Sequence, residues 1–394
     1  MTDRYTLISA DCHAGANIDT YMEYLDPAFR QAATEWREAY KNPFRDLQGD
    51  GRTRNWDDER RWSDLHADGT VAEVLFPNTV PPFFPTGALV ARPPTAADLD
   101  KRWAGLRSHN RWLKDWCDRY PGRRAGIGQV FLNDVDLAVD EARWIADAEL
   151  MGGVLIPAIP DDCDLEPLYS PVYDPFWKVC EERALVVNCH AGSGHPDYGK
   201  YPAASMMFAV ETDWFAHRPL WQMLFGGVFE RFPRLRFVLS EQGCDWLPRQ
   251  MKGFDLMHMW AGGGRTGELR LDKEAHLPLK PSEYFERNVW LGVAFPRPTE
   301  AQAMRKVGLH KVMWGSDYPH AEGTSPHSRL NLRRSFHDWD QADLEQVLSG
   351  TAAEVYGFDR DALAPLGAEY GPTVEELREP YEGFPEGSLS PGFF

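Results

Sequence analysis

The sequence lacks a closely spaced cysteine pair, a long apolar run and a basic patch. Its six cysteines never occur as Cys-x-x-Cys, so neither a zinc ribbon nor a thioredoxin-type redox site is expected. No run approaches the ~18 apolar residues of a membrane span, and no basic leader with an apolar stretch opens the chain. The sequence therefore predicts a reduced, cytoplasmic, soluble protein with no membrane partner.

Positive charge is also scarce. The 394 residues carry 42 Lys and Arg against 60 Asp and Glu, which gives a formal net charge of −18. Such a chain repels nucleic-acid phosphates unless its basic residues cluster, and its arginines are scattered among acids. We expect a small-molecule substrate and no nucleic-acid partner. The net charge does not fix the sign of a pocket, because a bound metal dominates locally.

Short apolar strands alternate with amphipathic helices along most of the chain, which is typical of a parallel sheet or barrel. Strands are predicted at residues 5–10, 71–76, 124–131, 153–156, 184–188, 236–239, 288–293 and 311–314. Helices are expected between them, among others at residues 134–150, 174–183 and 219–229. Eight strand–helix units favour a closed (β/α)8 TIM barrel over an open doubly wound sheet.

Three segments exceed a minimal barrel. Residues 17–66 form a Trp-rich insertion after strand one, which we interpret as a helical lid or cap. Residues 95–120 predict an extra helix after strand two. Residues 1–360 would then form one barrel domain, and the Pro-, Gly- and Glu-rich residues 361–394 are predicted to be an extended tail. An arm of this kind is suited to embrace a neighbouring subunit, so a homodimer is expected.

Residues able to bind a metal or move a proton stand where several predicted strands end. The candidate metal ligands are Asp11, His13, His190, Glu241 and Asp317. The carboxyl ends of barrel strands converge on one face, where active sites are built. Asp11 and His13 are two residues apart on a strand, so both side chains can reach one ion. A mixed N/O set is typical of Zn²⁺, with Mn²⁺ and Fe²⁺ as alternatives.

Each of these residues also has a purely structural explanation. Asp317 can cap a turn, His190 can be a half-buried histidine at a strand end, and Glu241 can form an ion pair. Their common position in the predicted barrel favours the metal centre. Asp317, Glu241 and His320 are the candidate proton-transfer groups, and His195 and Glu211 are candidates for contacting the substrate.

At these residues the chain resembles the amidohydrolase superfamily, in particular the branch of aminocarboxymuconate-semialdehyde decarboxylase and γ-resorcylate decarboxylase. Residues 8–13, 187–194, 227–241 and 314–320 carry the resemblance, and the last run is the most specific. The resemblance implies that Asp11, His13, His190 and Asp317 hold the metal. A second register remains open, in which Asp11 precedes an H-x-H pair and Gly15 replaces its second histidine.

Glu241 departs from the family pattern, because the decarboxylases usually carry a histidine after strand six. A glutamate can act as a base or bridge two ions, so one metal ion, or two bridged by Glu241, are both compatible with the sequence. His195, Glu211 or His320 would complete a second site. Strand four ends without a lysine at residues 154–157, so a carbamylated-lysine bridge is not available there.

Three hypotheses about function follow. The first is a metal-dependent hydrolase, in which a metal-activated water attacks an ester, thioester, lactone or amide of an apolar or aromatic acid. The second is a metal-dependent nonoxidative decarboxylase, a carboxy-lyase, of an aromatic or unsaturated carboxylic acid. The third is a binding protein that keeps the barrel without catalysis. Glu241 places hydrolysis first, and the fold alone cannot choose among the three.

Overall fold

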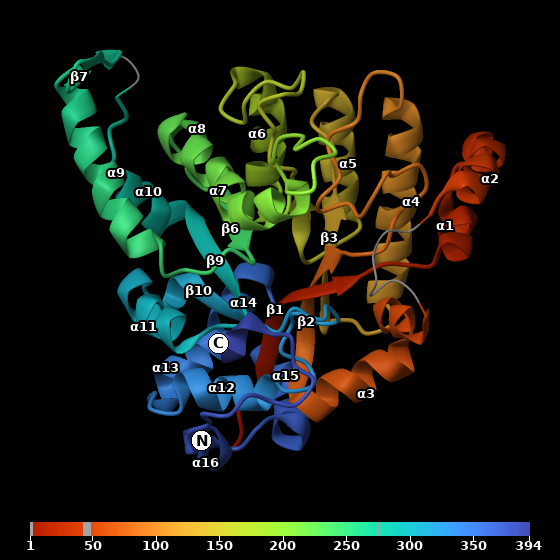
Figure 1. The fold of residues 1–394 in the computed structure, drawn as a ribbon, viewed down its shortest axis with the longest axis vertical. Coiled ribbons are helices and arrows are strands. Elements are labelled where there is room, and N and C mark those ends of the chain that lie inside the picture. The colour runs from red at the N-terminus through yellow and green to blue at the C-terminus, as the bar shows by residue number, and fades with distance from the viewer. Residues whose placement is uncertain (1–2, 42–48, 274–275) are drawn as a thin grey trace.

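The computed structural model describes residues 3–41, 49–273 and 276–394, and eight parallel strands form its centre (Figure 1). The strands are β1 Leu7–Ala14, β2 Thr70–Pro77, β3 Arg124–Gln129, β4 Gly153–Leu155, β5 Val186–His190, β6 Arg236–Ser240, β9 Val289–Ala294 and β10 Val312–Gly315. Neighbouring strands pair in chain order from β1 to β10. The Asp317 amide donates to the Asp11 carbonyl at 2.8 Å, and the His13 amide donates to the Tyr318 carbonyl at 2.7 Å. The ends of β1 and β10 therefore meet, which confirms the predicted (β/α)8 barrel.

Helices cover the outside of the barrel. They are α4 Leu99–Cys117, α5 Val135–Asp147, α6 Asp174–Glu182, α7 Ala204–Phe225, α8 Val228–Arg231, α9 Leu247–Gly262, α10 Pro281–Asn288, α11 Pro298–Val307, α12 Ser328–Phe336, α13 Gln341–Glu345 and α14 Thr351–Tyr356. Helix α5 shows why such segments form. The Asp134 carboxylate caps its first turn by accepting from the Leu137 amide at 3.0 Å. Ala138, Ala142 and Ile145 recur at helical spacing and are buried against the barrel.

The strands are buried on both faces, as expected when helices surround a parallel sheet. One apolar cluster includes Ile8, Val74 and Phe76 of the strands together with Tyr356 of α14. A larger cluster joins other strand residues to the surrounding helices. The Tyr356 hydroxyl donates to the Asn188 side-chain oxygen at 2.7 Å. Helix α14 is thereby tied to β5, and the core is continuous from the C-terminal helices to the barrel.

The insertion after β1 is helical, as predicted. It contains α1 Ile18–Tyr24, α2 Arg30–Ala39, the 3-10 helix η2 Gly49–Asn55 and α3 Asp58–Asp68. In Figure 1, α1 and α2 lie beside α4, whereas α3 runs along the barrel. The buried Arg61 of α3 forms an ion pair with Glu73 of β2, with 2.7 Å between Nη2 and Oε2, and donates to the His13 carbonyl at 2.8 Å. The insertion is therefore anchored directly behind one of the candidate metal ligands.

Glu73→Gln is expected to destabilise the fold strongly. Glu73 lies between Arg61 and Arg124, and all three side chains are fully buried. Loss of its charge leaves two buried guanidinium groups without their shared carboxylate, and breaking such a network typically costs about 3–5 kcal/mol. Urea unfolding followed by circular dichroism measures the change. The exposed Glu354→Gln serves as the matched control and should stay within about 0.5 kcal/mol of the parent. An equally small change in Glu73→Gln would contradict the expectation.

Two predicted segments differ from the structure. Helix α7 spans Ala204–Phe225, with Pro219 inside it, whereas the sequence predicts a helix that begins at Pro219. Proline is favoured in the first turn of a helix. The apolar residues of α7 lie on all sides of the helix, so its first half shows no amphipathic pattern.

Residues 361–394 are not an extended arm throughout, because α15 Arg360–Tyr370 and α16 Val374–Arg378 occupy the first part. Asp359 and Thr373 cap these helices, and Leu363 and Leu377 bury them on their own chain. The homodimer stays a prediction.

All six cysteines are free, and five of them are buried. Burial raises the pKa of Cys12, Cys117 and Cys189 to about 12, which leaves these thiols protonated and unreactive.

In the three described stretches of the chain, no helix has both the length and the apolar character needed to cross a bilayer.

Candidate metal centre

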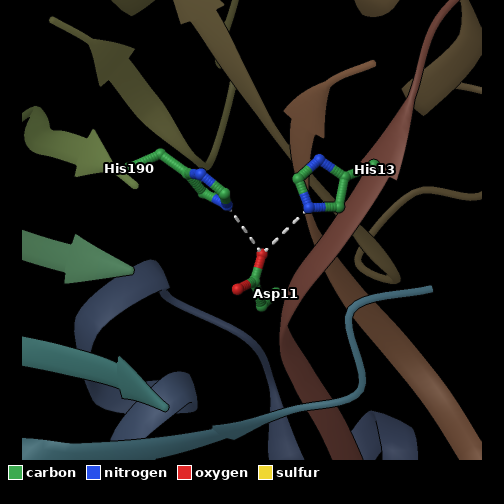
Figure 2. Close-up of side chains that lie close together, drawn as sticks. All are labelled: Asp11, His13 and His190. Atoms are coloured by element: carbon green, nitrogen blue, oxygen red, sulfur yellow. Dashed lines mark hydrogen bonds and ion pairs between the residues drawn. The ribbon is translucent and has the colours of Figure 1, made fainter. Parts of the chain in front are cut away.

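The ends of β1, β5 and β10 bring four candidate ligands together. His13 and His190 direct one ring nitrogen each at the Asp11 carboxylate, as Figure 2 shows, with 3.3 Å between each Nε2 and Oδ1. His13 Nε2 also lies 3.0 Å from Oδ1 of Asp317. None of these four side chains is more than 2% exposed. The two imidazoles and two carboxylates thus converge in the interior, as the strand-end positions predict.

Several polar atoms of this cluster lack a hydrogen-bond partner. They are Oδ2 of Asp11, both ring nitrogens of His13 and Oδ2 of Asp317. The contacts of His13 Nε2 with the carboxylates are close, but they do not have hydrogen-bond geometry. Buried polar atoms without partners are costly and rare. A cation among these nitrogen and oxygen donors would satisfy them, so the residues fit a divalent metal ion.

The backbone also favours Asp11 and His13 as the pair on strand one. Both residues lie within β1, which continues to Ala14, and alternate side chains of a strand point to the same face. Gly15 lies against Thr79, and a Cβ atom at position 15 would come within 2.1 Å of the Thr79 hydroxyl oxygen. No side chain fits there, which argues against a register that needs a ligand at this position.

A second layer of groups surrounds Asp317. Nδ1 of His320 lies 2.8 Å from Oδ1 of Asp317, and its Nε2 lies 3.1 Å from the side-chain oxygen of Asn78. The Asn78 amide in turn donates to Asn55 at 2.8 Å. Because both ring nitrogens of His320 face oxygen acceptors, this arrangement suits a protonated imidazolium that donates on both sides.

The electrostatics of the cluster favour negative charge on Asp11 and Asp317 and positive charge on His190 and His320. Burial opposes ionisation of Asp11, but His190 and His13 hold its pKa below the usual value, and His320 and His13 do the same for Asp317. Burial also opposes protonation of the histidines, yet Asp11 raises the pKa of His190 to about 9 and Asp317 raises that of His320 to about 10. A divalent cation would supply the same positive charge and leave the imidazole of His190 neutral, which is the form that ligates metals.

Glu241 stands between this cluster and the solvent. Its Oε2 lies 3.5 Å from Nδ1 of His190, and burial together with Asp317 raises the pKa of its carboxyl well above the usual value. Glu241 and Asp317 adopt φ angles of +57° and +59°, in the left-handed region that residues with a side chain seldom occupy. Strained backbone at two strand ends is typical of functional sites. Glu241, Asp317, His320 and Glu322 also place one donor atom each within 4.8 Å of one another, so Glu241 retains the geometry to share an ion.

A cavity of about 820 Å³ opens onto these groups. His190, Glu241 and His320 line its inner end, and Leu89, Phe208, Trp246 and Phe295 are among its apolar walls. No residue in the described part of the insertion, 17–41 and 49–66, lines this cavity. The volume suits a small organic molecule of the kind that aromatic and aliphatic walls bind.

The structure does not bring His195 and Glu211 to the cavity lining. His195 lies 2.9 Å from the Pro196 carbonyl through Nδ1, and Glu211 accepts from the Tyr198 hydroxyl at 2.8 Å. Their contact with a substrate stays a prediction. Asn78 also belongs to the site, and its place directly after strand two is the signal by which the sequence could have indicated it.

The amidohydrolase family matches residues 11–358. The γ-resorcylate decarboxylase of Rhodococcus jostii (strain RHA1) is 25% identical over 233 residues, which cover 54% of this chain and 65% of that enzyme. The chain thus spans just under two thirds of the length of this relative. The 2-amino-3-carboxymuconate-6-semialdehyde decarboxylase of Dictyostelium discoideum is 24% identical over 315 residues, 77% of each chain.

Among solved structures, a 5-carboxyvanillate decarboxylase from Novosphingobium aromaticivorans has a TM-score of 0.66 at 20% identity. The match covers 90% of this chain and 98% of that one. That structure contains bound manganese and 3-methoxy-4-hydroxy-5-nitrobenzoic acid. At this identity the likeness shows that the barrel fold is shared.

Proposed function

The chain belongs to the amidohydrolase family, and from this premise we propose that it is a metal-dependent nonoxidative decarboxylase of an aromatic or unsaturated carboxylic acid. The geometry that carries the proposal is the meeting of four metal-ligating groups and two proton-bearing groups at the inner end of one cavity. Both of these relatives are decarboxylases, which supports this reaction over hydrolysis, the first of the three hypotheses from the sequence.

The proposed reaction needs a metal and a proton donor. Asp11, His13, His190 and Asp317 would hold the ion. A bound divalent cation would fix the substrate and draw electron density from it. The bond between the carboxylate and the substrate carbon breaks, carbon dioxide leaves, and the electron pair that stays on the carbon takes up a proton. No oxidant or reductant is required.

The remaining groups of the site supply that proton and exclude water. His320, held by Asp317 and Asn78, and Glu241 both line the cavity. Asp317 raises the pKa of His320 to about 10, and burial together with Asp317 raises the pKa of Glu241 well above its usual value. Either can act as the general acid that protonates the carbon. The apolar walls bind the body of the acid and exclude water from the carbon centre. The predicted Zn²⁺ is one candidate for the ion, and Mn²⁺ or Fe²⁺ suit the same mixed donors.

Isotope labelling separates decarboxylation from hydrolysis. A panel of hydroxybenzoates, unsaturated carboxylic acids, aryl esters and acyl thioesters is offered to the metal-loaded enzyme in deuterium oxide and, in parallel, in oxygen-18 water. Decarboxylation predicts carbon dioxide release and one solvent deuterium at the carbon that carried the carboxylate, with no oxygen-18 in the organic product. Oxygen-18 in the acid product, with no carbon dioxide, would instead establish the hydrolase reaction and refute the proposal.

A further inference from the structure

Two polar side chains in the cavity wall carry buried atoms without a hydrogen bond and have no role in the reaction above. Gln242 follows Glu241 at the end of β6, and His217 lies on α7. Gln242 is 4% exposed and His217 is 8% exposed, and both line the cavity. Both amide atoms of Gln242 and Nε2 of His217 are buried without a hydrogen bond. Three such atoms in one wall are costly unless a ligand or water satisfies them.

The structure holds these side chains in place. The His217 ring stacks on the indole of Trp246, with 3.7 Å between ring centroids. The Trp246 Nε1 donates to the Gln242 carbonyl at 2.8 Å, so the three residues form one unit. Burial lowers the pKa of His217 to about 4, against the opposing effect of the Gln242 backbone, and the ring is therefore neutral. A neutral imidazole keeps one nitrogen as an acceptor.

We propose that Gln242 and His217 form a subsite for a neutral hydroxyl group of the substrate, distal to the carboxylate that is lost. A hydroxyl group can accept from the Gln242 amide and donate to Nε2 of His217 at the same time, which matches the free donor and acceptor. The inference rests on the proposed function, because it concerns the same substrate.

The charges at the cavity rim argue against a second carboxylate in this subsite. Asp213, Asp245 and Glu300 are carboxylates among the lining residues, and Arg297 is the one basic Lys or Arg side chain that lines the described cavity with them. The Arg297 Nε already donates to Glu300 at 3.2 Å, and its Nη2 lies 3.8 Å from Asp245. The guanidinium is thus neutralised, and a second anion would meet excess negative charge.

Binding of defined probes tests the subsite without turnover. Salicylate has no distal hydroxyl, whereas 2,3-, 2,4- and 2,5-dihydroxybenzoate carry one at different positions. Their dissociation constants for the metal-loaded protein are measured by quenching of tryptophan fluorescence, with calorimetry as a check. At least one dihydroxybenzoate should bind about tenfold more tightly than salicylate. Gln242→Leu and His217→Phe should abolish that preference and leave salicylate binding nearly unchanged.

A matched variant and a stability measurement make the test specific. The exposed Gln302→Leu on α11 should keep the preference. Gln242→Leu should also leave the thermal midpoint unchanged or raised, because it removes an unpaired polar group. The inference is overturned if the parent shows no preference or binds no probe, if Gln242→Leu keeps the preference, or if it unfolds the protein. Carbon dioxide release with no preference refutes the subsite alone, whereas a preference mapped to Gln242 with no carbon dioxide from any acid refutes the proposed reaction alone.

Discussion

His190→Ala is expected to remove the metal and with it the turnover. His190 ends β5, and its Nε2 faces Oδ1 of Asp11 at 3.3 Å, in the middle of the donor cluster. Alanine deletes one of the two candidate imidazole ligands and leaves His13 as the remaining imidazole beside the Asp11 carboxylate. Mutation of residues that hydrogen-bond to metal ligands lowers metal affinity by ~10–100-fold, and loss of a ligand itself should lower it further. Elemental analysis after dialysis gives the metal content per chain.

The control for this variant is His310→Ala. It makes the same substitution at an exposed histidine that pairs with Glu286 and does not line the cavity. It should retain the metal, the turnover and the metal-induced rise in thermal midpoint. The metal content of the parent protein also tests the role of Glu241: about two ions per chain would fit a Glu241 that bridges them, and about one would not. A His190→Ala protein with the parental metal content would refute the assignment of His190 as a ligand.

The barrel could be predicted from the sequence because its eight buried strands appear as short apolar runs that alternate with amphipathic helices. The ends of the elements were harder to predict where function interrupts the pattern. The apolar run of strand one stops at residue 10, yet β1 continues to Ala14, because Asp11 and His13 are polar residues inside a strand. The prediction of an extended tail at residues 361–394 differs from the structure for a similar reason. The Pro and Gly content of this segment hid the helical pattern of the few leucines that are buried in α15 and α16.

The candidate ligands could be predicted because the carboxyl ends of all barrel strands lie on one face, so residues at different strand ends are close in space. No such rule applies to Gln242 and His217. A polar residue on a helix or after a strand is usually solvated, and only packing reveals that these two are buried with polar atoms that lack a hydrogen bond. The same is true of Arg61, whose pairing with Glu73 and the His13 carbonyl depends on how the insertion folds against the barrel.

Asp317→Asn separates metal binding from proton transfer at the same residue. Asparagine keeps a carbonyl oxygen for the ion but loses the negative charge that holds His320 as an imidazolium. Without that charge, the pKa of His320 should fall from about 10 towards its ordinary value. We therefore expect most of the metal to remain while turnover drops by about 10²–10⁴-fold, the range typical of a lost general acid or base.

His320→Gln is the second arm of this experiment. Asp317 and His320 act as one unit in the proposed reaction, so the double variant should be no slower than the slower single variant. The exposed Asp338→Asn is the matched control and should leave turnover unchanged. Additive losses would mean that Asp317 serves mainly the metal and that another group protonates the carbon. Glu241 is then the other candidate acid that lines the cavity, and Glu241→Gln should also lower turnover.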